Sequence, residues 1–261
     1  MLQNEHDAQW FEYLAQSQLA RVDLTSGEVQ RLGSPGLYSR AALSPDGSAV
    51  LVTRLQRPFS YLVPWQAFPQ RQEVWDRQGQ PVRMVHEAGL QENVPIGGVP
   101  VGPRNIDWVP VLPHALTWIE ALDGGDPNAK VTPRDRVMLL TELDGLPTAW
   151  AVTDHRTQGL SFGQDGQLTL LGEMQRETRR QRVLALDLKD PSRPARVLYE
   201  RSMQDVYGDP GTPVREVRPD GLVALRQRGA QIFLSGQGAS KDGSRPFLDA
   251  WRSEEHTSEL Q

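Results

Sequence analysis

The sequence contains no cysteine, only three lysines and no long apolar run. Without cysteine there is no disulfide framework and no thiolate chemistry, so any metal site would have to use histidine and carboxylate ligands. None of the apolar runs approaches the ~20 residues that a membrane-spanning helix needs. Residues 1–15 carry Glu5, Asp7 and Glu12 and lack a basic start and an apolar core, so we expect no signal peptide there.

The sequence also lacks a cluster of basic residues of the kind that binds polyphosphates. Lys and Arg together number 28 against 33 Asp and Glu, which gives a net charge of -5 over 261 residues. Nucleic-acid binding requires clustered Lys and Arg that displace counterions, and no basic stripe occurs here. We therefore expect neither a nucleic-acid nor a membrane partner, and no cofactor. The 38% hydrophobic content suffices for an ordinary globular core.

Most of the chain consists of short apolar runs separated by turn residues, the pattern of an all-β protein. Residues 5–16 form the one short segment that we expect to be helical. Residues 19–24 and 28–32 flank Thr-Ser-Gly, and residues 73–75 and 81–85 flank Asp-Arg-Gln-Gly. Both patterns predict β-hairpins. Amphipathic segments of helical length do not recur, which argues against alternating βαβ units.

An apolar residue, a turn and a second apolar run recur together at intervals of 54 to 65 residues, beginning at Leu43, Trp108, Phe162 and Val217. Three of the four turns contain Asp-Gly, in which Asp hydrogen-bonds within the turn and Gly accepts positive φ. These pairs are Asp46-Gly47, Asp165-Gly166 and Asp220-Gly221. The period predicts a partial β-propeller of about four to five blades, each with four antiparallel strands, in an open ring.

Several longer stretches resemble one known family. They are Arg57-Pro58-Phe59-Ser60-Tyr61, Ala67-Phe68-Pro69, Glu73-Val74-Trp75, Val94-Pro95-Ile96, residues 120–126, Pro133-Arg134-Asp135, residues 205–211, residues 236–240 and Pro246-Phe247-Leu248-Asp249. Together they are similar to the propeller of glutamyl endopeptidases, which belong to the prolyl oligopeptidase family of serine peptidases. The resemblance covers nearly all of residues 1–251.

This resemblance implies a two-domain parent enzyme, in which a seven-bladed propeller covers a C-terminal α/β-hydrolase domain bearing a Ser, Asp, His triad. It further implies that residues 1–251 are a partial propeller, with the N-terminal blades and the hydrolase domain absent. We expect the chain itself to be non-catalytic and to gate peptide access in the parent. Its expected partners are the peptide substrate and the missing hydrolase domain. We also expect a soluble, bacterial protein, cytoplasmic or exported.

The final segment, residues 252–261, departs abruptly from the family. It resembles the translation of a sequencing-adapter oligonucleotide, so we exclude it from reasoning about the fold. An isolated open ring would expose unpaired strand edges, which invite association. Poor solubility is therefore expected, and a stable monomer in sedimentation would argue against it.

One motif imitates a catalytic site. Residues 159–163 read Gly-Leu-Ser-Phe-Gly and match the GxSxG nucleophile elbow around Ser161. That elbow requires a strand before the serine and a helix after it. Here a hairpin turn and a second strand are expected to follow, and the one histidine after Ser161 is His256 in the adapter-like segment. We reject Ser161 as a nucleophile; labelling by a serine-reactive phosphonate would reverse this.

Other candidates have simpler structural interpretations. Residues 120–128 offer several oxygen ligands but lack the ligand order of a calcium-binding EF-hand, which favours an ordinary polar turn. Arg57 and Arg104 could steer acidic peptides, although a salt bridge is the favoured role for each. Three tryptophans in strand positions are expected in the core: Trp108, Trp118 and Trp150. No catalytic, cofactor or metal residue is assigned, and substrate-binding residues remain unknown.

An alternative function from another class is a stand-alone propeller that serves as an interaction scaffold without peptidase activity. Propellers support many unrelated functions, so the fold alone does not decide between the two. The source reading frame discriminates them, because a peptidase parent would continue into GxSxG followed by Asp and His.

Overall fold

The computed structural model describes residues 1–252, and these residues form two compact units. The first unit comprises Met1–Trp108, Pro113–Ala129 and Leu140–Pro147. The second comprises Val109–Leu112, Lys130–Leu139 and the chain from Thr148 onward.

The first unit begins with helix α1 (Glu5–Ala15), where the sequence predicts it. The side chain of Asn4 caps the helix by accepting a 3.0 Å hydrogen bond from the backbone N–H of Asp7. On the inner side of the helix, Phe11 packs edge-to-face against Phe59 at 5.3 Å between ring centroids. No helix within residues 1–252 is long and apolar enough to cross a membrane.

An antiparallel sheet follows the helix, with its five strands adjacent in sequence order. The central strand β3 is buried on both faces, which explains its near-continuous apolar sequence. The strands are β1 (Ser17–Val22), β2 (Val29–Leu43), β3 (Ala49–Leu55), β4 (Gln70–Asp76) and β5 (Pro81–Ala88).

Both predicted hairpins are confirmed in this sheet. Strands β1 and β2 meet at Val22 and Val29, and Asp23 closes their turn by accepting hydrogen bonds from two backbone N–H groups at 2.8 and 2.9 Å. Strands β4 and β5 are joined in the same way, because Asp76 accepts from the backbone N–H groups of Gln78 and Gln80.

The remainder of the first unit contains a 3₁₀ turn, η1 (Trp65–Ala67), and the paired strands β6 (Arg104–Trp108) and β7 (Leu116–Ala121). The indole N–H of Trp108 donates to the carbonyl of Ala42 at 2.8 Å and ties β6 to β2. Trp108 and Trp118 are both buried in this unit, as is Trp150 in the other. Their predicted core positions are confirmed.

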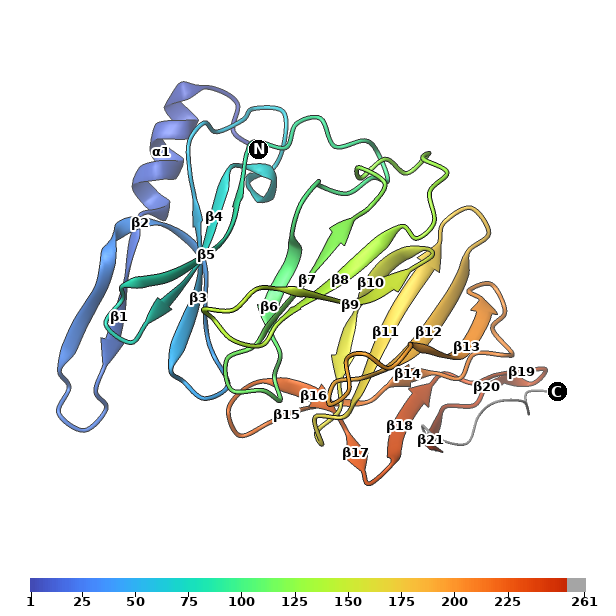
Figure 1. Ribbon diagram of the computed structural model, residues 1–261. Coiled ribbons are helices and arrows are strands. Elements are labelled where there is room, and N and C mark those ends of the chain that lie inside the picture. The colour runs from blue at the N-terminus through green and yellow to red at the C-terminus, as the bar shows by residue number, and fades with distance from the viewer. Residues whose placement is uncertain (253–261) are drawn as a thin grey trace. The chain divides into compact units, whose positions relative to one another are not determined.

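The second unit contains β8 (Asp135–Leu140) up to Leu139 and β9 (Thr148–Thr153), which pair antiparallel. A four-stranded antiparallel sheet follows, in which sequence neighbours lie side by side (Figure 1, yellow to orange). Its strands are β10 (Arg156–Phe162), β11 (Leu168–Gln175), β12 (Arg180–Asp187) and β13 (Arg196–Ser202).

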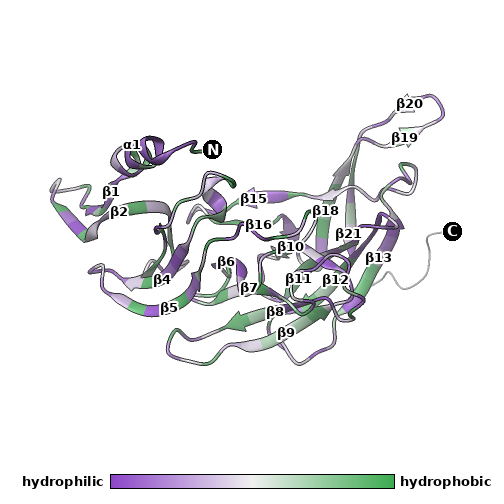
Figure 2. Ribbon diagram, turned by 90° about the horizontal axis from the view of Figure 1, so that it is seen from above, coloured by the Kyte–Doolittle hydropathy of each residue, from purple (hydrophilic) through white to green (hydrophobic). Residues whose placement is uncertain are grey.

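The last group of strands is built around β18, which pairs with β14, β17 and β21. The hairpin of β19 and β20 extends away from this sheet (Figure 2). The strands are β14 (Thr212–Pro213), β15 (Arg215–Val217), β16 (Val223–Leu225), β17 (Gln227–Arg228), β18 (Gln231–Gly236), β19 (Ala239–Ser240), β20 (Gly243–Ser244) and β21 (Phe247–Arg252). Of the adapter-like segment 252–261, Arg252 ends β21 and the rest lies outside the described residues.

Each of the four repeats found in the sequence forms a β-hairpin in the structure. Each apolar residue pairs across a hairpin with a residue just beyond the turn: Leu43 with Val50, Trp108 with Leu116, Phe162 with Thr169, and Val217 with Val223. The site without Asp-Gly therefore forms the same hairpin. The all-β, partial-propeller assignment is confirmed, with four successive strand groups.

Candidate functional site

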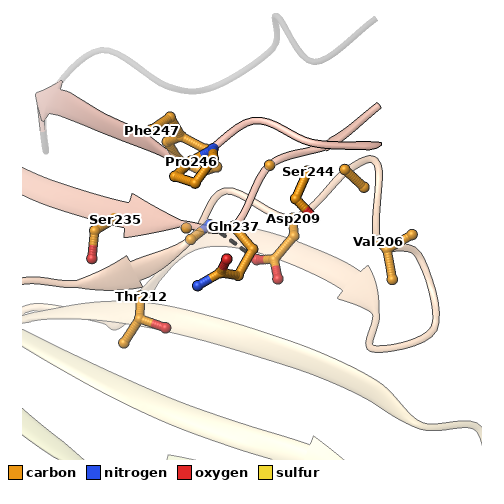
Figure 3. Close-up of a pocket in the computed structure, with 12 residues that line it drawn as sticks. Val206, Asp209, Thr212, Ser235, Gln237, Ser244, Pro246 and Phe247 are labelled. Atoms are coloured by element: carbon orange, nitrogen blue, oxygen red, sulfur yellow. Dashed lines mark hydrogen bonds between the residues drawn. The ribbon is translucent and has the colours of Figure 1, made fainter. Parts of the chain in front are cut away.

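A pocket of about 770 Å³ lies in the second unit, beside the end of β18 and the hairpin of β19 and β20 (Figure 3). Its size is within the range of 300 to 1,000 Å³ that is usual for ligand sites. The apolar side chains of the lining are Val206, Ala239, Pro246 and Phe247. Polar side chains complete the lining: Asp209, Thr212, Ser235, Gln237 and Ser244.

Three glycines bring the backbone close to the ring of Phe247. A Cβ atom at Gly236 would come within 2.6 Å of that ring, and one at Gly211 within 3.1 Å. At Gly238 a Cβ atom would overlap the carbonyl oxygen of Arg245 and approach the ring to 3.2 Å. Because no side chain fits at these positions, the pocket wall presents bare backbone around an aromatic ring.

The loop before β14 is fixed by Asp209. Its carboxylate accepts a 2.9 Å hydrogen bond from the backbone N–H of Gly211 and pairs with the guanidinium of Arg201 at 3.0 Å. Arg201 also donates to the carbonyl of Asp205 at 2.9 Å. Charge-assisted bonds of this kind hold the loop in one conformation. The loop therefore forms a preformed edge of the pocket.

Four polar side chains around the pocket are available to a ligand. Thr212, Ser235, Gln237 and Ser244 are exposed, and within residues 1–252 none of their side chains hydrogen-bonds to another residue. In Figure 3, Gln237 lies between Thr212 on one side and the rings of Pro246 and Phe247 on the other. The site combines hydrogen-bonding groups with an apolar surface and contains no catalytic constellation.

The pocket is formed by three stretches that carry the family resemblance but that the sequence does not mark as a site. Residues 205–211, 236–240 and 246–249 all contribute to its lining. The signal that could have identified the site was the concentration of glycine in two of these stretches, because glycine also marks close backbone approach.

Ser161 occupies a strand and not a nucleophile elbow. It lies in β10, opposite Leu170 of β11, and a hairpin turn follows it, as the sequence predicts. Its hydroxyl accepts a 2.8 Å hydrogen bond from the guanidinium of Arg215, a group that does not act as a general base. The geometry around Ser161 is that of a structural strand residue.

The two arginines considered for steering acidic peptides lie in the first unit. Arg57 donates two hydrogen bonds to one carboxylate oxygen of Glu12, at 2.8 and 3.1 Å, and lies 3.8 Å from the carboxylate of Glu5. This ion pair fastens α1 to the loop after β3. Arg104 begins β6 and is half-buried.

The possible calcium loop, residues 120–128, folds on its own hydrogen bonds. Asp123 accepts from the backbone N–H of Gly125 and Asp126 from that of Asn128, both at 2.9 Å. These bonds are typical of polar turns. Within residues 1–252 there is no group of three or more histidine or acidic side chains that could hold a metal ion.

Two curated plant proteins are similar to this chain. The "Probable glutamyl endopeptidase, chloroplastic" of Oryza sativa subsp. japonica is 36% identical over 261 residues, and the protein of the same name from Arabidopsis thaliana is 35% identical over 260 residues. Each match covers 95% of this chain, which spans 27% of the relative's length. The resemblance drawn from the sequence motifs is confirmed. Because both relatives come from plants, they do not support the expected bacterial source.

No family model matches the chain. Among solved structures, an oligogalacturonate lyase in complex with manganese is 13% identical, with a TM-score of 0.48, and the match covers 90% of this chain and 56% of the lyase. The acylaminoacyl peptidase of Pyrococcus horikoshii is 11% identical, with a TM-score of 0.47, covering 92% of this chain and 34% of that enzyme. At these low scores, neither protein's activity bears on this chain.

Proposed function

Because this chain is related to the glutamyl endopeptidases over 95% of its length, we propose that it is a propeller region of a serine peptidase of that kind. In the parent enzyme, these blades would stand over the entrance to the hydrolase domain and admit short or unfolded peptides. The chain itself would provide no catalytic group. The 36% identity to the rice relative is the observation that carries the proposal.

Two structural features support a gating role over a catalytic one. Within the strand groups, hairpins at Asp46, Asp165 and Asp220 close through tight, Asp-capped turns, which suit a rigid framework. The one sequence motif that resembles a nucleophile, around Ser161, is held in a strand. A rigid wall around a narrow entrance would exclude folded proteins by size while allowing an extended peptide to pass.

Activity of the full-length parent tests this proposal. We would express the uninterrupted reading frame and compare cleavage of a short glutamate-containing peptide with cleavage of the same sequence placed in a surface loop of a folded protein. We expect cleavage of the peptide, little cleavage of the folded protein, and restored cleavage once that protein is unfolded. The chain of 261 residues should cleave neither substrate.

Each outcome has a separate meaning. Equal cleavage of the folded and short substrates would overturn the gating role and leave the peptidase assignment intact. No cleavage of any substrate would overturn the assignment itself. Cleavage by the 261-residue chain alone would contradict its non-catalytic role.

A further inference from the structure

The pocket beside β18 has the features of a binding site for an uncharged stretch of peptide. An extended peptide presents amide groups along its backbone and points successive side chains to opposite faces. The pocket offers the complement of both, with Thr212, Ser235, Gln237 and Ser244 as hydrogen-bonding groups and the ring of Phe247 as an apolar surface.

The charge of the side chains that line the pocket favours some ligands over others. Asp209 is the one charged side chain among the described residues that line the pocket, and it is negative. No lining arginine or lysine is present to pair with an acidic side chain. Because Asp209 is already paired with Arg201, an acidic side chain bound here would lose hydration without gaining a cationic partner, whereas a neutral side chain would not carry that cost.

The site is also preformed. The Asp209 carboxylate is held by Arg201 and by the N–H of Gly211, and the three glycines fix the backbone around Phe247. A preformed site avoids much of the ordering cost of binding. The free side chains can therefore engage a ligand without first giving up a bond to another residue in the described chain.

We propose that this pocket is a secondary peptide-binding site, which holds a non-acidic part of a substrate peptide away from the residue that is cleaved. The inference rests on the proposed function, because it takes the peptide to be a substrate of the parent enzyme. It adds a recognition surface on the propeller and assigns it a ligand of defined chemistry.

Binding by the chain itself tests this inference. We would titrate the 261-residue chain with N-acetylated tetra-alanine amide and follow the backbone amide NMR signals of Gly236, Gln237 and Gly238. We expect saturable shifts at these signals, and weaker binding of the matching tetra-glutamate peptide. Thr212→Val and Ser235→Ala should each weaken tetra-alanine binding about fivefold, the effect of one lost hydrogen bond.

The control variant is Ser192→Ala, which removes a hydroxyl from an exposed loop of the same unit outside the pocket. It should bind as the unmodified chain does, and unchanged amide signals elsewhere would show that all three variants remain folded. The inference fails if tetra-alanine causes no shifts, if tetra-glutamate binds equally well, or if the pocket variants bind normally. Shifts with maltotriose and none with tetra-alanine would instead identify a carbohydrate site.

The two proposals can fail separately. The binding measurement uses only this chain, whereas the cleavage measurement uses the full-length enzyme. An active, gated peptidase whose propeller does not bind tetra-alanine would overturn only the secondary site. Binding by the chain together with an inactive parent would overturn the peptidase assignment and the view that the bound peptide is a substrate, and would leave only a peptide-binding pocket.

Discussion

At the scale of single residues, His114 occupies a position between two carboxylates. Its Nδ1 atom lies 3.2 Å from Asp46 and its Nε2 atom 3.3 Å from Glu142, all within the first unit. A neutral imidazole has one N–H and can donate to one of them, whereas the protonated ring donates to both. The bonds to Asp46 and then Glu142 raise the pKa of His114 above 6.5.

Asp46 is favoured in its ionised form by the same cluster. Burial raises the pKa of its carboxyl, but hydrogen bonds from Ser44, Ser48 and His114 outweigh burial and leave it well below the usual value. The carboxylate therefore stays charged while His114 titrates, and the ion pair is controlled by the histidine.

We predict that His114 stabilises the chain mainly in its protonated form. Because its folded-state pKa is raised, the stabilisation is fully present below the unfolded pKa of ~6.5 and is lost as pH rises through the folded value. Urea unfolding of the unmodified chain and of His114→Gln should therefore differ most at pH 5.5 to 6 and converge at alkaline pH. NMR titration of the imidazole should give a midpoint above 6.5, and Glu142→Gln should lower it.

A midpoint at or below 6.5, or a stability difference that grows with pH, would contradict this account. The sequence could not reveal the cluster, because Asp46 and Glu142 lie 68 and 28 residues from His114 along the chain. No local sequence pattern indicates that these three residues meet. Contacts between hairpin turns depend on tertiary packing.

At the scale of elements, two arginines of β12, Arg180 and Arg182, form ion pairs with neighbouring strands of the same sheet. One of the two glutamate partners is buried, and the other is exposed. Glu173 of β11 has a fully buried side chain, pairs with Arg182 at 2.5 Å and accepts a 2.9 Å bond from the backbone N–H of His155. Glu200 of β13 pairs with Arg180 at 2.7 Å, and both of those side chains are more than one-third exposed. The two pairs form a matched comparison.

We predict that Glu173→Gln destabilises the chain by about 2 kcal/mol, because Arg182 loses its buried counter-charge and keeps only its ion pair with the half-exposed Asp154. The control, Glu200→Gln, should cost less than about 1 kcal/mol, as solvent screens that pair. Urea midpoints at neutral pH measure both. Equal losses from the two substitutions would show that burial does not determine the strength of these pairs.

Two glycines, Gly221 and Gly238, allow a similar comparison of the loss of stability at an open and at a closely packed position. Gly221 and Gly238 both have positive φ, of +80° and +59°, but nothing lies within 4 Å of a Cβ atom at Gly221, whereas one at Gly238 would overlap backbone. We predict that Gly221→Ala costs about 1 to 2 kcal/mol, the penalty of a left-handed conformation. Gly238→Ala should cost clearly more and displace Phe247, which NMR signals around the pocket would report. Equal costs would contradict the close packing described there.

Element prediction from the sequence succeeded where the signal was local. The hairpins closed by Asp23 and Asp76 follow from apolar runs on either side of turn residues, and the Asp-Gly turns follow from an aspartate that caps its own turn. The short strands β14 to β20 were not resolved individually, because pairing with distant residues defines them: β14, for example, pairs with β18 across more than twenty residues. The pocket escaped prediction for the same reason.

At the scale of the whole molecule, two findings support the assignment to a peptidase propeller. They are the sequence similarity over 95% of the chain and the propeller strand groups within each unit. The fold class follows from the spacing of the four repeats, and the resemblance to glutamyl endopeptidases follows from ordered motifs that single repeats do not contain. The chain spans 27% of the length of its curated relatives, so a peptidase activity of the whole protein is a proposal.

The most direct test of the central claim is to sequence the source gene across codon 252 and read onward. The account predicts that the native frame departs from residues 252–261 and continues into a hydrolase domain containing GxSxG, followed in order by Asp and His. A native frame that stops near Gln261, with no such domain, would contradict it. In that case the propeller would be better explained as a stand-alone interaction scaffold.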